Sequence, residues 1–337
     1  MQRTPARLQA DRLHTTRTSR LSECSLETFM TPETKTAIEV ASRRFGHYVV
    51  SRRLGQGGQA EVFYAEAQHG EIHAALKLAR AGSAEDSLTD EADLMGLLSH
   101  PNLVTLLEHG ITHGRPFIAM EYLVGGDLSA LMAAYRRAMK PFPVALGVHA
   151  CIEVLKGLSY FHHAKTRTGS PLNLVHGDVN PANVYFGEDG GVKLGDFGVA
   201  SSSHADIGPQ QGVAMGKLSY LSPEQTRGEV LTPSTDVWAV GVMLFEAVVG
   251  FHPFQKEDAS DDAVMASIRS GKLNFPAFLE KPMQGILKQA LAVDVRTRFR
   301  SAGEFAGPLF GYALDAGLTM TPWQVRDELQ SVLDLVL

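Results

Sequence analysis

The sequence predicts an α+β fold in two lobes: a small antiparallel β lobe that carries one helix, and a larger, mainly helical lobe. Short runs rich in β-branched and aromatic residues dominate residues 48–120, with one helical pattern among them. Amphipathic helical patterns dominate after residue 126. The length of 337 residues also exceeds one small core. We therefore divide the chain into a flexible N-terminal extension (1–44), the small lobe (45–122), the large lobe (123–312) and a C-terminal helical tail (313–337).

Composition and charge are typical of a soluble globular protein, with 44% hydrophobic and 20% charged residues. A net charge of -6 gives no reason to expect nucleic acid or an anionic membrane as a partner. Cys24 and Cys151 are too few and too far apart for a disulfide scaffold or a metal cluster, which favours a reducing compartment. The apolar run 237–251 is too short to span a bilayer, and the N-terminus lacks the apolar core of a secretory signal. We therefore expect a cytoplasmic protein.

The N-terminal extension is rich in Arg, Ser and Thr and poor in periodic apolar positions. Its composition is similar to that of a transit peptide. A disordered tail, or a start codon placed upstream of Met30, also accounts for it. We favour these two explanations because a compositional match alone is a weak signal.

A glycine-rich segment lies near the start of the small lobe. Gly55, Gly57 and Gly58 join two apolar strands. They form either a plain hairpin turn or a loop whose backbone N–H groups approach a phosphate, because glycine has no Cβ in the way. Lys77 lies on the next strand, where it is either solvated surface or a bridge between phosphates.

Residues 83–99 predict a helix whose apolar face holds Leu88 and Met95, with Glu91 on the same face. A buried carboxylate is costly unless it is paired. Glu91 therefore either pairs with Lys77 or lies at the edge of this face in water.

Two further strands, residues 104–107 and 117–120, complete the small sheet, and residues 121–126 link it to the large lobe. Helical patterns then follow at residues 128–138, 144–163, 236–249, 262–270, 282–292, 302–314 and 322–337. The last helix carries apolar residues at helical spacing, which pack on the large lobe or pair with another chain. We favour packing.

One strand-like stretch within the helical lobe carries polar residues suited to chemistry. The apolar runs 184–186 and 192–194, joined by a Glu-Asp-Gly-Gly turn, predict a β-hairpin. Asp178 and Asn183 precede the hairpin and Asp196 follows it, so strand pairing brings them together. Two acids and an amide are suited to holding Mg²⁺ and a phosphate while aiming a hydroxyl at it.

In this order the segments resemble the signature set of the protein kinases. The matching segments are Gly55–Val62, Ala74–Lys77 with Glu91, His176–Asn183, Asp196–Gly198 and Ser222–Glu224. The similarity covers residues 48–312, and details such as residues 222–225 look most like bacterial serine/threonine kinases. The resemblance implies the two-lobed protein-kinase fold, with ATP and Mg²⁺ as cofactors.

The resemblance also implies an ATP site. Gly55, Gly57 and Gly58 would cover the phosphates, and Lys77, paired with Glu91, would hold two of them. The implied adenosine contacts are Val62, Ala75, Glu121, Leu123 and Asp127, with Met120 as the gatekeeper.

The implied chemistry belongs to Asp178, which matches the catalytic aspartate, and to Asn183 and Asp196, which match the Mg²⁺ ligands. Supporting roles are implied for Arg298 as the buried partner of Glu224, for Asp236 beneath the catalytic loop, and for a stack that contains Met95, Leu106, His176 and Phe197.

Gly177 departs from the family pattern, because it replaces the arginine that usually binds a phosphate on the activation loop. Residues 200–216 contain Ser201, Ser202 and Ser203 but no threonine. We therefore expect activity that is independent of activation-loop phosphorylation.

A second departure concerns positive charge. Asn180 replaces a lysine that usually contacts the γ-phosphate, and Lys217 replaces a threonine just after the loop glycine. A lysine lost and a lysine gained in adjoining places suggest that the charge is relocated. Lys217 is thus a candidate catalytic residue that reaches Asp178 and the γ-phosphate. The alternative is a solvent-facing Lys217 in a damaged site.

The function that the resemblance implies is a Mg-ATP-dependent serine/threonine protein kinase with protein substrates as its partners. One alternative is a small-molecule phosphotransferase of the aminoglycoside or choline kinase type, which shares the His-Gly-Asp pattern but lacks a segment like residues 216–225. Another is a pseudokinase scaffold, motivated by Gly177, Asn180 and Lys217. We expect no nucleic-acid or membrane partner, and a monomer or weak dimer.

Overall fold

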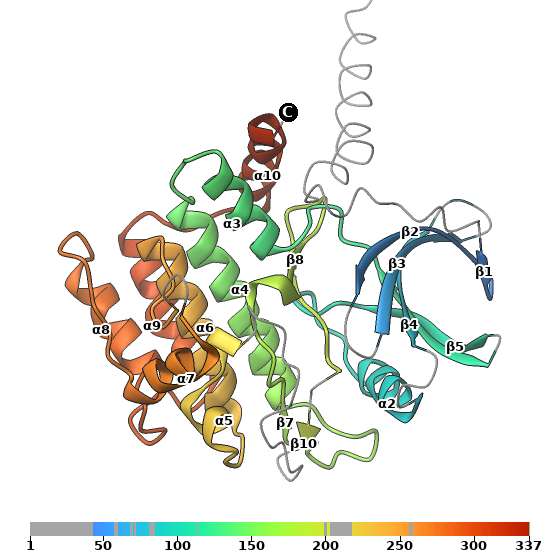
Figure 1. Cartoon of the computed structure of the whole chain (residues 1–337), viewed down its shortest axis with the longest axis horizontal. Helices are drawn as coiled ribbons and strands as arrows, with labels where there is room; N and C mark the ends of the chain where they lie inside the picture. The colour runs from blue at the N-terminus through green and yellow to red at the C-terminus, as the bar shows by residue number, and fades with distance from the viewer. Residues whose placement is uncertain are drawn as a thin grey trace, which may run out of the picture.

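The computed structural model describes residues 43–56, 60–67, 70, 72–80, 85–112, 114–198, 201–202, 218–255 and 259–336. These residues form two lobes joined by a short link, with the β-rich lobe on the right of Figure 1 and the helical lobe on the left. The predicted two-lobed α+β fold is confirmed.

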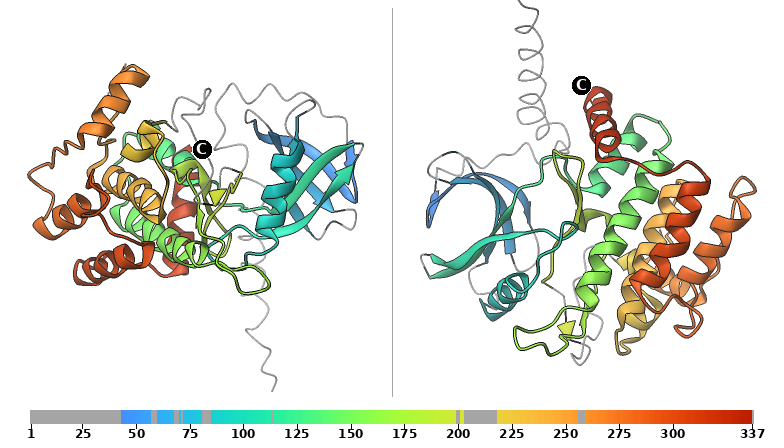
Figure 2. Two further views of the ribbon diagram at one scale, coloured as in Figure 1. Left: turned by 90° about the horizontal axis from the view of Figure 1, so that it is seen from below. Right: turned by 180° about the vertical axis from the view of Figure 1, so that it is seen from behind.

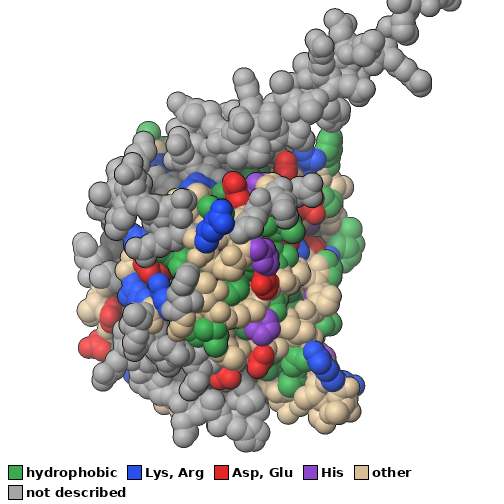
Figure 3. Space-filling model, turned by 90° about the vertical axis from the view of Figure 1, so that its right-hand side faces the viewer, with side chains coloured by type: hydrophobic (Ala, Val, Ile, Leu, Met, Phe, Trp, Pro, Cys, Tyr) green, Lys and Arg blue, Asp and Glu red, His purple; other side chains and the backbone are tan. Residues whose placement is uncertain are grey.

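The small lobe is one curled antiparallel sheet with the strand order β1-β2-β3-β4-β6-β5, and helix α2 (Glu85–Met95) packs against β6 and β5. The strands are β1 (Arg43–Phe45), β2 (Tyr48–Gln56), β3 (Ala60–Ala67), β4 (His73–Ala79), β5 (Leu106–Thr112) and β6 (Arg115–Glu121). On the side of this lobe that faces the viewer in Figure 3, acidic, basic and hydrophobic side chains are interspersed wherever the surface is not grey.

Several boundaries in the small lobe differ from the prediction, and helix α2, which we expected to run to Ser99, ends at Met95. Arg43 and Arg44, which we assigned to the flexible extension, pair with β2 as part of β1. The strand expected at 104–107 begins at Leu106 instead, because the backbone N–H of Val104 donates to Leu194 O at 2.9 Å. As an edge strand, β5 is only half-buried and rich in polar residues, which obscured its true extent.

The large lobe is built around two apolar helices, α4 and α6, which pack against each other and against α9 (Figure 2). Its helices are α3 (Leu128–Arg137), α4 (Val144–His162), α5 (Pro223–Arg227), α6 (Pro233–Val249), α7 (Asp261–Ser270), α8 (Lys281–Ala290), α9 (Ala302–Asp315) and α10 (Pro322–Val336). Helix α9 runs past residue 313, where we placed the start of the tail. Among the described residues only α4 is long and apolar enough to cross a membrane, with a mean hydropathy of 1.3, and its burial in this core accounts for that composition.

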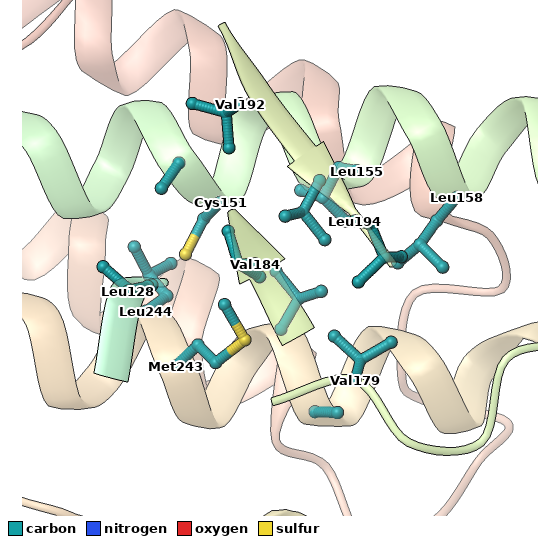
Figure 4. Packing of buried hydrophobic residues seen from close by; sticks show 14 of the residues in the cluster. Leu128, Cys151, Leu155, Leu158, Val179, Val184, Val192, Leu194, Met243 and Leu244 are labelled. Atoms are coloured by element: carbon teal, nitrogen blue, oxygen red, sulfur yellow. The ribbon is translucent and has the colours of Figure 1, made fainter. Parts of the chain in front are cut away.

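The described part of the large lobe also holds the short strands β7 (Leu174–Val175), β8 (Val184–Phe186), β9 (Val192–Leu194) and β10 (Ser201–Ser202). Antiparallel pairing of β8 with β9, which sets Val184 opposite Leu194, confirms the predicted hairpin. Figure 4 shows Val184 beside Cys151 of α4 and Met243 of α6, while Leu194 lies near Leu155. Burying each such side chain contributes roughly 1.5–3 kcal/mol, so the helical core holds the hairpin firmly.

Helix α10 packs on the large lobe, as we expected. Its apolar residues Val325, Leu329 and Val332 are buried, and it lies beside α3 in Figure 1. A Cβ at Gly190, in the turn between β8 and β9, would come within 2.1 Å of Pro322 O. The tail therefore leans directly against the hairpin that carries the polar loops.

Candidate active site

A cleft of about 330 Å³ lies between the lobes, against the link that joins them. Its walls include the predicted nucleotide-binding residues Gly55, Val62, Ala75, Lys77, Glu91, Met120, Glu121, Leu123 and Asp127, together with Asp196. Of the other predicted site residues, Asp178 and Asn183 do not line the cleft, and Gly57, Gly58 and Lys217 lie outside the described residues.

Sequence reasoning missed several other residues of the cleft wall, notably Leu54, Tyr122 and Tyr185. The alternation of side chains along a strand would have found Tyr185. Its neighbours Val184 and Phe186 face the helical core, so Tyr185 must face the other way. Leu54 and Tyr122 have no such signal, because they are apolar or aromatic residues of an ordinary strand and link.

Lys77, Glu91 and Asp196 form a three-membered ion cluster at the back of the cleft. Lys77 Nζ lies 2.7 Å from both carboxylate oxygens of Glu91 and 2.8 Å from Asp196 Oδ1. Glu91 is buried, so the alternative in which it lies in water is wrong. Burial alone would lower the pKa of Lys77, but the charges of Asp196 and Glu91 outweigh it and raise that pKa, which keeps the ammonium group protonated.

The backbone around Asp196 is fitted closely to this cluster. Asp196 itself has φ 64°, a left-handed conformation that aspartate tolerates better than most residues and that is common at functional sites. At Gly198, an added Cβ would lie 2.9 Å from Glu91 Oε2. Only glycine fits at that position without displacing Glu91.

The loop that carries Asp178 is braced by two amides. Asn183 Nδ2 donates to Asp178 Oδ2 at 3.1 Å, and Asn180 Nδ2 donates to Asp178 Oδ1 at 2.9 Å. The N–H of Gly195 donates to Asn183 O at 2.9 Å, which brings the loop of Asp196 alongside. The structure therefore assembles Asp178, Asn183 and Asp196 at the open end of one hairpin, opposite its turn.

Asp236, from the first turn of α6, holds the same loop from beneath. Its carboxylate accepts the backbone N–H groups of His176 and Gly177, both at 2.8 Å, and lies 2.8 Å from His162 Nε2. Burial alone would raise the pKa of Asp236, but the bond to His162 and the other donors outweigh it and lower that pKa. The carboxylate therefore stays charged beneath the loop.

Comparison with known proteins agrees with this geometry. Residues 48–306 match the protein kinase domain. The chain belongs to the protein kinase family. The reaction of this family is the ATP-dependent phosphorylation of proteins.

Bacterial relatives of this kinase include the tyrosine-protein kinase MasK of Myxococcus xanthus, which is 35% identical over 82% of our chain and 45% of its own. The serine/threonine-protein kinase PknJ of Mycobacterium tuberculosis is 31% identical over 82% of our chain and 48% of its own. The serine/threonine-protein kinase PrkC of Bacillus subtilis is 28% identical over 78% of our chain and 40% of its own. Our chain thus spans less than half the length of these relatives, and the kinase is of the bacterial, eukaryotic-like type.

A hydrophobic stack connects the lobes of the kinase. The Phe197 ring stacks on Phe161 with 5.6 Å between centroids, and its centroid lies 5.4 Å from that of His176. Met95, which we predicted in this stack, is buried in the same core, and Leu106 packs against that core half-buried. Phe161 was missed because one apolar residue of an apolar helix has no distinguishing pattern.

The residues that match the Mg²⁺ ligands fit that ion. Asn183 uses its amide nitrogen on Asp178, so its carbonyl oxygen is the group that would face a cation, together with the Asp196 carboxylate. Within the described ranges no group of three or more His, Cys, Asp or Glu side chains could hold a metal ion. Mg²⁺ is usually bound by one or two protein oxygens plus substrate phosphates, so this sparse donor set suits an ion that arrives with ATP.

Proposed function

We propose that this kinase transfers the γ-phosphate of Mg-ATP to serine and threonine hydroxyl groups of proteins. The ion cluster of Lys77, Glu91 and Asp196 carries the proposal, because it places the phosphate-binding cation 2.8 Å from an oxygen of the expected metal ligand. An assembled cluster of this kind also speaks against a pseudokinase scaffold.

In the mechanism we propose, Lys77 holds the ATP phosphates and Asp178 accepts the proton of the acceptor hydroxyl while orienting its oxygen. Asn183 and Asp196 would hold Mg²⁺, which supplies charge neutralisation on the phosphates when bound. Phosphoryl transfer demands mainly positioning and electrostatic stabilisation, and the braced loop of Asp178 suits that demand.

The proposal is tested with the full chain, γ-labelled ATP, Mg²⁺ and a generic basic protein, followed by mapping of the labelled residues. Phosphoserine and phosphothreonine are the expected products, as the names of PknJ and PrkC suggest. Label found only on tyrosine, the acceptor named for MasK, would overturn the acceptor class. Transfer to an aminoglycoside or choline but not to protein would favour the small-molecule alternative, and no transfer at all would favour the scaffold.

We also propose that activity is independent of activation-loop phosphorylation. Two anchors of the activation segment need no phosphate: β10 pairs with β7 through Ser201 and Val175, and Gln225 Nε2 donates to Gly177 O at 2.8 Å. Gly177 has φ 76°, which costs glycine little but would strain an arginine by roughly 1–2 kcal/mol. These neutral hydrogen bonds, in a chain without the usual arginine at position 177, support the proposal.

Alanine replacement of Ser201, Ser202 and Ser203, the last of which lies outside the described residues, is therefore expected to leave the rate within a few-fold of the parent. The measurement is the initial rate of phosphate transfer to a protein substrate. Treatment of the parent with a phosphatase provides the matched control and should be equally neutral. A collapse of activity in either case would refute the proposal.

Lys217 remains our candidate for the relocated positive charge. We expect Lys217→Ala to lower kcat on the order of a hundredfold, because an electrostatic donor to the transition state is lost. Lys281→Ala, at the exposed start of α8, is the control for removal of a lysine and should not change kcat. If Lys217→Ala leaves kcat nearly unchanged, Lys217 does not supply the relocated positive charge.

We also propose a cytoplasmic location for this kinase. Cys151 is a free, buried thiol, and burial raises its pKa to about 12, which makes it an inert core residue. A reducing cytoplasmic location suits such a residue. For the oligomeric state, our expectation of a monomer or weak dimer stands as a prediction.

A further inference from the structure

We propose that Asn180 is a positioning residue, which holds the Asp178 carboxylate in place for phosphoryl transfer. The inference rests on the proposed role of Asp178 as the group that accepts the hydroxyl proton. Asn180 itself touches neither nucleotide nor acceptor in this scheme; it acts through Asp178.

The side chain of Asn180 uses both its amide nitrogen and its amide oxygen in hydrogen bonds within the loop. The side chain is 3% exposed. Its Nδ2 donates to Asp178 O and to Asp178 Oδ1, both at 2.9 Å. Its Oδ1 accepts the backbone N–H of Ala182 at 3.0 Å and so caps the 3-10 helix Pro181–Asn183. One amide therefore connects the proposed base to the turn that carries the proposed metal ligand.

Asn183 completes the brace from the other side. Its Nδ2 donates to Asp178 Oδ2 at 3.1 Å and to Asp178 O at 2.7 Å. Each carboxylate oxygen of Asp178 thus receives an amide N–H, one from Asn180 and one from Asn183. Rotation of the carboxylate would break at least one of these bonds, which are worth more than neutral ones because the acceptor is charged. The brace therefore fixes both the position and the rotamer of Asp178.

Asn180 has no N–H group available for a phosphate oxygen. A primary amide has two N–H groups, and both of those on Asn180 are directed to Asp178. No N–H of Asn180 is left over for a phosphate oxygen. A lysine in its place would offer a third donor and a charge. Asn180 therefore retains the positioning of Asp178 and leaves charge stabilisation of the γ-phosphate to another group.

Two substitutions separate the donor of Asn180 from its acceptor. Asn180→Asp keeps an oxygen to cap Ala182 but has no N–H for Asp178, while Asn180→Lys keeps an N–H donor and loses the cap. If positioning of Asp178 is the role, Asn180→Lys should retain kcat within about tenfold, and Asn180→Asp and Asn180→Ala should lose about 10- to 100-fold. The KM for ATP should stay within a few-fold in all three, because Asn180 does not line the nucleotide cleft.

The control is Asn102→Ala. Asn102 is also buried, and its Nδ2 donates to Glu153 Oε2 at 2.8 Å and to Val192 O at 2.9 Å, away from Asp178. This variant should lose thermal stability without losing kcat per folded molecule. A reversed order, with Asn180→Asp active and Asn180→Lys inactive, would assign Asn180 to capping alone and overturn the inference.

The two proposals fail in different ways. Full kcat in Asn180→Ala and Asn180→Asp, together with an inactive Asp178→Ala, would overturn the role of Asn180 and leave the proposed function intact. Full activity in Asp178→Ala would overturn the proposed role of Asp178 itself. Rates are to be normalised to the folded fraction of each variant, measured by binding of a fluorescent ATP analogue.

Discussion

Replacing Asp178 with alanine is expected to lower kcat for protein phosphorylation by about a thousandfold. The Asp178 carboxylate is the proposed acceptor of the hydroxyl proton, and a methyl group can neither orient nor deprotonate the hydroxyl. ATP binding should persist, because Asp178 is not among the residues that line the nucleotide cleft. The measurements are initial rates at saturating Mg-ATP and the dissociation constant of ATP.

Asp189→Ala is the matched control for this variant. Asp189 lies at the other end of the hairpin, in the exposed turn between β8 and β9, where its Oδ1 accepts the N–H of Gly191 at 2.9 Å. Its loss should weaken the turn and leave kcat unchanged. Equal losses of ATP affinity and kcat in Asp178→Ala would point to a damaged loop instead of a lost base, and a loss below tenfold would contradict the role.

The hairpin and its polar loops could be predicted from sequence because two local signals agree there. Alternating apolar residues and a Gly-Gly turn specify β8 and β9, and pairing of these strands then fixes the relative position of Asp178 and Asp196. The Lys77–Glu91 ion pair could also be predicted from the sequence. A carboxylate on the buried face of α2 needs a cation, and the preceding strand supplies it.

Contacts that depend on side-chain geometry across long sequence separations could not be predicted. Gln225 reaches Gly177 O only because its helix, α5, begins at the capping box of Ser222 and turns the side chain back toward the loop. Asn180 looked like a lost lysine, since its sequence context does not show where its two N–H groups point. Residue type alone therefore suggested a missing positive charge at position 180, where the structure has two hydrogen bonds to Asp178.

Replacing Glu224 with alanine is expected to lower the free energy of unfolding by about 3–5 kcal/mol, the usual cost of removing one partner of a buried ion pair. Glu224 and Arg298 are 2% and 1% exposed, and Arg298 Nη1 lies 2.7 Å from Glu224 Oε1. Without Glu224, the guanidinium keeps, among the described residues, the carbonyls of Ala292 and Ser234 and the ring of Trp238, none of which carries a negative charge. Denaturant unfolding of the parent and the variant measures the loss.

Arg296→Ala is the control for Glu224→Ala, because the Arg296–Asp294 pair is exposed and its removal should leave the unfolding midpoint essentially unchanged.

The ion pair of Glu224 with Arg298 also predicts that the stability of the protein depends on pH. Burial alone would raise the pKa of Glu224, but the hydrogen bonds and charge of Arg298 outweigh it and hold that pKa below 4.5. Its stabilisation is therefore fully present above pH 4.5 and lost as the pH falls through the lower folded pKa. In Glu224→Ala the free energy of unfolding should fall less steeply as the pH drops below 4.5. If the variant loses stability in acid as steeply as the parent, the pair of Glu224 and Arg298 is not the cause of that loss.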